Sequence, residues 1–258
     1  MHIEFIGLPG AGKSTIRTGL LNQLSRSSKE KYLSVDQALL HVAKENIDGI
    51  YRYPLQILPN HFSLMLLNKI NNRSIMHYNA QNEYLALYGG SLQAYLASSA
   101  YQSMSEKDRS LVIGFFLEAA SIKQCLSNHL SSDHTVIFDE SLLQKSFMFV
   151  NHKENLTSST DVINYLEYIP IADIAIVIDT DIEVCLQRIR ERPRGLTSRL
   201  KKLDENEISQ FFAASSTHIK TVQQWLLGNT ATKVIEIDNH DSPSQAIDLI
   251  FSQINKSH

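Results

Sequence analysis

Residues 7–15 read Gly-Leu-Pro-Gly-Ala-Gly-Lys-Ser-Thr and follow a short apolar run, Ile3-Glu4-Phe5-Ile6. Their spacing matches G-x-x-x-x-G-K-[ST], a loop whose successive backbone N–H groups can surround phosphate oxygens. The preceding run predicts a buried strand, and residues 13–26, which carry several leucines on one face, predict a helix. The alternative interpretation, a glycine turn that only joins a strand to a helix, would not require lysine and serine at residues 13 and 14. The strand–loop–helix context therefore favours a phosphate-binding loop.

Each residue type in this loop has a chemical role at its position. Glycines let the backbone approach phosphate closely, and the start of the following helix adds a partial positive charge. We expect Lys13 to reach the β- and γ-phosphates and the Ser14 hydroxyl to ligate Mg²⁺. The predicted nucleotide-binding residues of the loop are Gly7, Pro9, Gly10, Ala11, Gly12, Lys13, Ser14 and Thr15.

Four further apolar runs predict strands, and each of them is followed by a segment with helical character. This alternation predicts an α/β protein with a parallel sheet. A block of helical character, about residues 40–133, separates the second strand from the third and predicts a large helical insertion. We interpret residues 1–258 as a single domain. The five predicted strands are 3–6, 32–35, 134–138, 174–178 and 233–237.

The composition excludes several classes of protein. The chain of 258 residues is 43% hydrophobic and 20% charged, an ordinary globular balance. Its net charge of −3 offers no global attraction to nucleic acid or anionic membrane, and the apolar run at residues 111–117 is too short to span a bilayer. Two distant cysteines, Cys125 and Cys185, exclude a disulfide framework and fit a reducing compartment. We expect a cytoplasmic protein with no nucleic-acid or membrane partner, and a homodimer stays open.

Acidic residues follow two of the predicted strands. Because the carboxyl ends of parallel strands form the ligand edge of an open sheet, Asp139 and Glu140 are placed to hold Mg²⁺ and to act as a base toward a hydroxyl acceptor. Which of the two is the base stays open. Asp179 borders an apparent capping box, Thr180 to Glu183. Helix capping therefore accounts for an acidic residue at this position without a catalytic role. Asp36, which can also cap a helix, is a weaker candidate for the substrate site.

Five arginines fall within residues 188–199. Arg188 and Arg192 are four residues apart and would share one face of a helix that ends at Pro193. Arg194 follows in a glycine-containing connection. Such a segment can close over phosphates as a lid, about residues 188–203, and its planar guanidinium groups can neutralise charge on the transferred group. A solvated helix face is the alternative interpretation.

With GLPGAGKST at residues 7–15, Asp139-Glu140 after the third strand and RIRERPRG at residues 188–195, the chain resembles P-loop kinases of the nucleoside and nucleotide type, thymidylate-kinase-like in layout. The resemblance implies a three-layer α/β/α P-loop NTPase fold with strand order 2-3-1-4-5 and a lid before the last strand. The chain departs from the family in two respects: Ser141, not arginine, follows the acidic pair, and the long helical insertion carries no recognisable acceptor motif.

These observations predict an ATP- and Mg²⁺-dependent kinase with a small-molecule acceptor. Lys13, Asp139, Glu140, Arg188 and Arg192 would be catalytic, Ser14 and Asp139 would hold the metal, and Arg194 would contact ATP. A nucleoside, nucleotide, sugar, other metabolite or protein hydroxyl all remain open as acceptors. The alternative is a regulatory ATPase or nucleotide switch that acts with a protein partner. A phosphate-loop enzyme of another kind, such as one that resembles sulfotransferases, is disfavoured by the Lys13-Ser14 pair.

Overall fold

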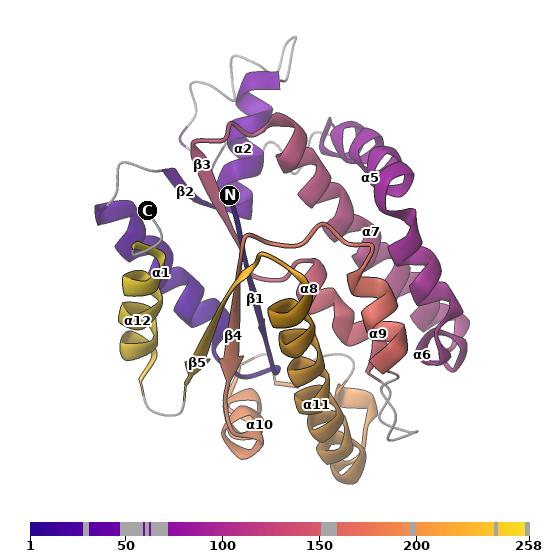
Figure 1. The fold of residues 1–258 in the computed structure, drawn as a ribbon. Coiled ribbons are helices and arrows are strands. Elements are labelled where there is room, and N and C mark those ends of the chain that lie inside the picture. The colour runs from indigo at the N-terminus through magenta and orange to yellow at the C-terminus, as the bar shows by residue number, and fades with distance from the viewer. Residues whose placement is uncertain are drawn as a thin grey trace.

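Five short strands form one parallel sheet in the order β2-β3-β1-β4-β5 (Figure 1). This confirms the predicted fold class and strand order. The strands are β1 (His2–Gly7), β2 (Lys31–Ser34), β3 (His134–Phe138), β4 (Ile174–Asp179) and β5 (Lys233–Asp238). The structure is a computed structural model, and it describes residues 1–27, 31–46, 59, 62, 72–150, 159–193, 195–196, 200–239 and 242–255.

Helices cover both faces of the sheet, with α1 and α12 on one side and α8, α9 and α11 on the other (Figure 1). The α-helices are α1 (Lys13–Ser27), α2 (Val35–Asn46), α5 (Asn72–Ala97), α6 (Ser99–Gln102), α7 (Glu106–His129), α8 (Leu142–Lys145), α9 (Ser159–Leu166), α10 (Ile182–Arg190), α11 (Glu205–Asn229) and α12 (Pro243–Asn255), and the short 3₁₀ helices are η1 (Ser146–Phe149) and η2 (Leu200–Lys202).

The segment between β2 and β3 contributes helices α2, α5, α6 and α7. Within the predicted helical insertion, residues 60–70 lie almost wholly outside the described residues. The limits 40–133 for the insertion and 1–258 for a single domain stay predictions. By length and composition α7, which contains the apolar run 111–117, could cross a membrane, a possibility that the short run alone did not indicate, and 44% of its apolar window is buried inside the protein. A single helix of this kind is weak evidence for a membrane span, because the core helix of a soluble protein meets the same criteria.

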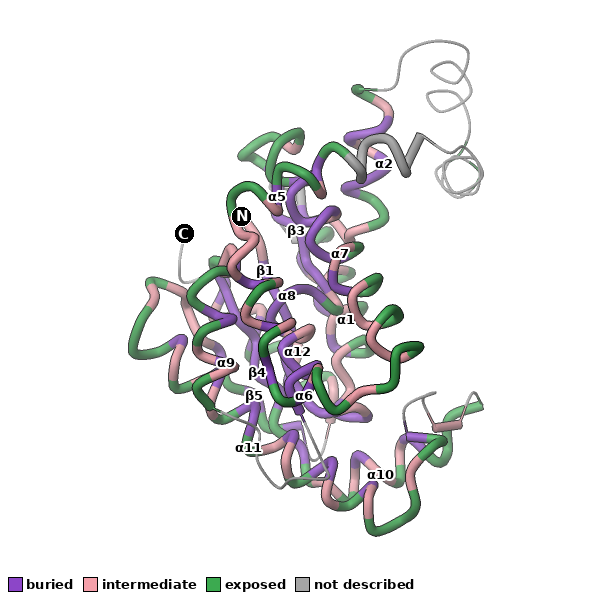
Figure 2. The backbone as a smooth tube through the Cα atoms, turned by 90° about the vertical axis from the view of Figure 1, so that its right-hand side faces the viewer, coloured by how far each residue is buried: buried purple, intermediate pink, exposed green. Residues whose placement is uncertain are grey.

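The main core lies around the sheet, where the strands are covered on both faces. Figure 2 shows the buried segments running through the strands and the inward turns of the helices. All five residues of β3 are buried, as are the first five of β4. In register, Gly7 pairs with Ile178 and Asp179 pairs with Asp238. Strands β1, β4 and β5 therefore end at one edge, where the phosphate loop begins.

Two predicted helix caps are wrong. At α2, the hydroxyl of Ser34 accepts a hydrogen bond from the Gln37 N–H, and the Gln37 side chain accepts one from the Ser34 N–H, so Ser34 is the cap and Asp36 lies within the first turn. At α10, the N-cap residue is Asp181, with no side-chain capping bond, and the Thr180 hydroxyl instead donates to the Asp179 and Ala11 carbonyls. In both places an adjacent polar residue competes for the capping position.

One charged pair is buried in the centre of the fold. Glu4, on the middle strand β1, is fully buried, and it forms an ion pair with Lys123 of α7, which is 1% exposed. The Lys123 Nζ also donates to the Pro170 carbonyl at 2.6 Å. The second carboxylate oxygen of Glu4 accepts the Leu143 N–H at 3.0 Å. This pair therefore connects the central strand to α7 and to α8, which follows the Asp139-Glu140 pair.

Candidate active site

The phosphate loop requires glycine at two of its positions. Gly10 and Gly12 have φ values of +88° and +91°, a region that other residues rarely adopt. A Cβ on Gly10 would lie 2.4 Å from the Cys185 carbonyl oxygen, and one on Gly12 would lie 2.6 Å from Nδ2 of Asn239. Both conformation and space exclude a side chain there, so the loop packs directly against α10 and the end of β5.

Lys13 is held inside the loop. Its Nζ donates to the carbonyl oxygens of Gly7 at 2.7 Å and Leu8 at 3.0 Å. Burial lowers the pKa of Lys13 to about 8, the nearby carboxylates of Glu140 and Asp139 oppose that shift, and Arg192 adds to it. The ammonium thus stabilises the loop that it belongs to and lies within electrostatic range of three further predicted site residues.

Ser14 and Asp139 meet across the edge of the sheet. The Ser14 hydroxyl donates to the two carboxylate oxygens of Asp139 at 3.1 and 3.3 Å. A hydroxyl and a carboxylate are hard oxygen donors, which suit Mg²⁺ held jointly by protein and substrate phosphates. Among the described residues, no three His, Cys, Asp or Glu side chains converge on a metal position. The two side chains predicted as metal ligands therefore fit an ion that a nucleotide would help to hold.

Arg17, which the sequence analysis did not select, also reaches this carboxylate. Its guanidinium lies 4.0 Å from Asp139, and its Nε is buried without a hydrogen-bond partner among the described residues. Arg17 lies three residues after Ser14 on α1, so both side chains project from the same face of the helix. That spacing was the sequence signal that could have identified it.

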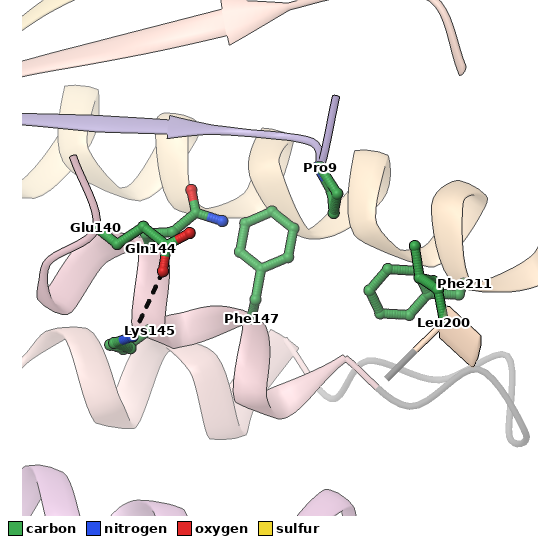
Figure 3. Close-up of a pocket in the computed structure, with 7 residues that line it drawn as sticks. All are labelled: Pro9, Glu140, Gln144, Lys145, Phe147, Leu200 and Phe211. Atoms are coloured by element: carbon green, nitrogen blue, oxygen red, sulfur yellow. Dashed lines mark ion pairs between the residues drawn. The ribbon is translucent and has the colours of Figure 1, made fainter. Parts of the chain in front are cut away.

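Glu140 faces a cavity of about 250 Å³ beside the phosphate loop. Its carboxylate lies 3.6 Å from the Lys145 ammonium, and it is 61% exposed. In Figure 3 the lining side chains converge from the loop, from α8 and η1, and from η2 and α11. The seven described residues that line the cavity are Pro9, Glu140, Gln144, Lys145, Phe147, Leu200 and Phe211. The two adjacent acids thus face different parts of the site: Asp139 contacts the loop serine, and Glu140 faces the cavity.

The ends of β4 and β5 hold the far end of the loop. The Ala11 carbonyl accepts a hydrogen bond from Nδ2 of Asn239 at 2.7 Å and a longer one from the Thr180 hydroxyl at 3.4 Å. Across a trans peptide the C=O and the next N–H point in opposite directions. The Gly12 N–H therefore points away from Asn239 and Thr180. Thr180 is not among the residues predicted for the site, since the sequence places it in an apparent capping box.

The predicted arginine lid is only partly described. Arg188 donates from Nη2 to the Asn239 carbonyl at 3.3 Å, close to the phosphate loop. Helix α10 ends at Arg190, so the prediction that Arg188 and Arg192 share a helix face is wrong. Arg190 forms an exposed ion pair with Glu205. Arg194 lies outside the described residues.

The other predicted loop residues have distinct positions. Pro9 lines the cavity, Ala11 is buried, and Thr15 is exposed on the first turn of α1. The Gly7 N–H donates to Oε1 of Gln144 at 3.2 Å, a contact between residues 137 positions apart in the chain. Gln144 was not predicted, since a single glutamine after a strand carries no recognisable signal.

Comparisons with known proteins establish the fold and leave the activity to be inferred. No protein-family profile and no curated protein matches the sequence. Among solved structures, the chain is similar to deoxyadenosine kinase from M. mycoides with dCMP and a flexible dCDP bound, with a TM-score of 0.52 and 16% identity over 99% of this chain and 100% of that one. The same enzyme with dATP bound gives 0.51 and 17% over the same shares.

A third similar structure is thymidylate kinase from Candida albicans, with a TM-score of 0.48 and 14% identity over 99% of this chain and 89% of that one. Because its TM-score is below 0.5, this match does not bear on the fold of the chain. The similarity to deoxyadenosine kinase does, and at 16–17% identity it shows the fold alone. It agrees with the strand order found here and with the expected resemblance. The chain has the P-loop fold found in nucleoside and nucleotide kinases.

Proposed function

We propose that this protein is a kinase that transfers the γ-phosphoryl group of Mg²⁺-ATP to a small-molecule acceptor, a nucleoside or a nucleotide. The observation that carries the proposal is the juxtaposition of a complete phosphate loop, the Ser14–Asp139 contact and an adjoining cavity faced by Glu140. The shared fold with deoxyadenosine kinase supports the class of acceptor.

The geometry suggests different roles for the two acids. Asp139, bonded to Ser14, would hold Mg²⁺ together with that hydroxyl. When bound, the ion would neutralise charge on the β- and γ-phosphates. Glu140 faces the cavity and would orient the acceptor hydroxyl and accept its proton. Phosphoryl transfer depends mainly on positioning and charge stabilisation, which this arrangement of loop, acid and cavity supplies.

The cations near the loop would stabilise the transferred group. Lys13 would exchange its bonds to the loop carbonyls for bonds to the β- and γ-phosphates. Arg188, held at the end of β5, and Arg192, within electrostatic range of Lys13, would balance charge that develops during transfer. A contact between Arg194 and ATP stays a prediction.

The test is phosphorus NMR of the protein with Mg²⁺-ATP and separate pools of nucleosides, nucleoside monophosphates and sugars. We expect a phosphorylated product in one of the first two pools. In Lys13→Ala the rate should fall by about 10²–10³-fold. Arg26→Ala removes an exposed cation from the last turn of the same helix and should leave the rate unchanged.

The other outcomes are equally informative. Unchanged turnover in a folded Lys13→Ala protein, checked by circular dichroism, would remove the phosphate-loop mechanism. A product from the sugar pool alone would keep the kinase and overturn the acceptor class. Slow release of free phosphate that no pool accelerates would favour a regulatory ATPase that acts with a protein partner.

A further inference from the structure

The carboxamide of Gln144 has a defined orientation. Its Oε1 lies 3.2 Å from the backbone nitrogen of Gly7. A backbone N–H can only donate, so the oxygen must face Gly7 and the Nε2 group must face the other way. In Figure 3 the nitrogen of Gln144 points into the cavity, toward Phe147 and Pro9. The side chain therefore presents two N–H donors to the cavity.

Those donors are available to a ligand. No protein group within the described part of the chain accepts a hydrogen bond from Nε2 of Gln144, and this nitrogen is not among the buried polar atoms that lack a partner. It is thus accessible to whatever occupies the cavity. An acceptor that enters without an oxygen or nitrogen at this position would displace water from the donors and leave them unpaired, which costs affinity.

The remaining lining restricts the chemistry of the ligand. Glu140 and Lys145 form a pair, and Lys145 is also held over the Phe115 ring at 5.7 Å. The opposite charges of the pair largely cancel, so it adds little net charge to the cavity. The aromatic rings of Phe147 and Phe211 favour flat apolar surfaces. Together they fit an uncharged, planar group that carries a hydrogen-bond acceptor.

Gln144 lies on an anchored element. Three buried side chains hold α8 and the start of η1: Glu4 accepts the Leu143 N–H at 3.0 Å, the Tyr165 hydroxyl donates to the Leu142 carbonyl at 3.0 Å, and Ser146 is hydrogen-bonded to His218 at 2.8 Å. Specific recognition requires such rigid support, because a mobile donor loses its directionality.

We propose that Gln144 is a specificity-determining residue: Nε2 donates to a carbonyl oxygen or ring nitrogen on an uncharged planar part of the phosphoryl acceptor, while Oε1 holds the Gly7 N–H. The inference rests on the proposed function, since it assigns the cavity to the acceptor. It also makes Gln144 a direct link between the acceptor cavity and the first residue of the phosphate loop.

Two substitutions separate these two bonds. Gln144→Glu keeps an oxygen for the Gly7 N–H and loses the donors, whereas Gln144→Met loses both. For the most active nucleoside or nucleotide in the panel, Gln144→Glu should raise the acceptor KM about tenfold or more. The KM for ATP should change less than twofold. In Gln144→Met both KM values should rise. The matched control is Gln81→Glu, the same chemical change on α5, where no contact of the side chain is described.

A binding experiment without ATP separates this inference from the proposed function. Ligand-observed NMR with adenosine, deoxyadenosine, deoxycytidine and thymidine should show binding to the wild-type protein and to Gln81→Glu, and much weaker binding to Gln144→Glu. That result supports the inference even if no transfer is detected. Equal binding by wild type and Gln144→Glu, or an unchanged acceptor KM in an active enzyme, overturns it and leaves the kinase proposal intact. No binding of any of the four to wild type overturns it as well.

Discussion

Replacement of Lys123 by methionine should destabilise the protein strongly, although Lys123 is outside the candidate active site. Lys123 is 1% exposed and its partner Glu4 is fully buried. Methionine keeps the length and apolar stem of lysine, so the change removes the ammonium with little change in packing. Among the described residues it leaves the buried Glu4 carboxylate with the Leu143 N–H as its remaining donor, and it leaves the Pro170 carbonyl without the Lys123 ammonium.

The size of the destabilisation follows from the buried polar groups that lose their partner. Removal of one partner of a buried ion pair costs about 3–5 kcal/mol, since the other charge remains uncompensated. An unpaired carbonyl adds to this cost, so we expect a value in the upper half of the range, about 4–5 kcal/mol. For a domain of this size that corresponds to a fall in Tm of roughly 8–20 °C. The double variant Glu4→Gln, Lys123→Met removes both charges and should be more stable than Lys123→Met alone.

The assay is urea denaturation of wild type, both single variants and the double variant at pH 7, followed by circular dichroism. A loss of less than about 1 kcal/mol in Lys123→Met would show that the pair is not buried in the way described. A double variant that loses the full sum of the single losses would refute the coupling between the two charges. Because Glu4 also holds the start of α8, we expect Lys123→Met to raise the acceptor KM at temperatures where it is still folded.

Three further predictions concern pH and loop support. The pKa of Lys13 is about 8 without nucleotide, so above pH 8 the free protein loses the ammonium that would bind the phosphates. The Kd for Mg²⁺-ATP, measured by calorimetry, should therefore increase by up to tenfold per pH unit above pH 8, and in Lys13→Arg it should not change with pH. Asn239→Ala removes the donor to the Ala11 carbonyl and should weaken ATP binding about tenfold with little change in acceptor KM; equal Kd values would exclude this role. Burial lowers the pKa of His218 to about 3, so the unfolded chain takes up a proton below pH 6.5 that the folded chain does not. His218 should therefore contribute about 2 kcal/mol to the loss of stability from pH 7 to pH 5, measured by urea titration, and the loss should be smaller by that amount in His218→Gln.

The fold was predictable because its signals are local. Each strand is a short apolar run, and the glycines at Gly10 and Gly12 meet a conformational requirement that no other residue satisfies as well. The strand order has no such local signal, because it depends on which strands pair with one another. It came from the resemblance to P-loop kinases and was confirmed by the sheet. Helix ends were less predictable: α10 ends at Arg190, before Pro193, because a proline limits a helix without fixing its last residue.

The candidate site was predictable only where one stretch of sequence carries the chemistry. Ser14 and Asp139, both predicted as metal ligands, lie in hydrogen-bond contact because the motif places one and the end of a strand places the other, and their role at a metal stays a prediction. Gln144 and Thr180 were not identified, since their partners lie 137 and 169 positions away in the chain. A glutamine that accepts one distant N–H has the same local pattern as a glutamine in solvent. Long-range contacts of single polar side chains leave no periodicity to detect.

The phosphate loop is held at both ends by side chains that belong to opposite sides of the site. At its start the Gly7 N–H is bound by Gln144, which lines the cavity, and near its end the Ala11 carbonyl is bound by Asn239, whose own carbonyl accepts a bond from Arg188. A loop rich in glycine has little intrinsic preference for one conformation. These two anchors therefore help to determine where its N–H groups point, and in the proposed kinase each anchor would lie beside a different ligand. Occupancy of the cavity and the position of Arg188 act on the same short segment, so the loop is the structural element through which acceptor and nucleotide would influence each other.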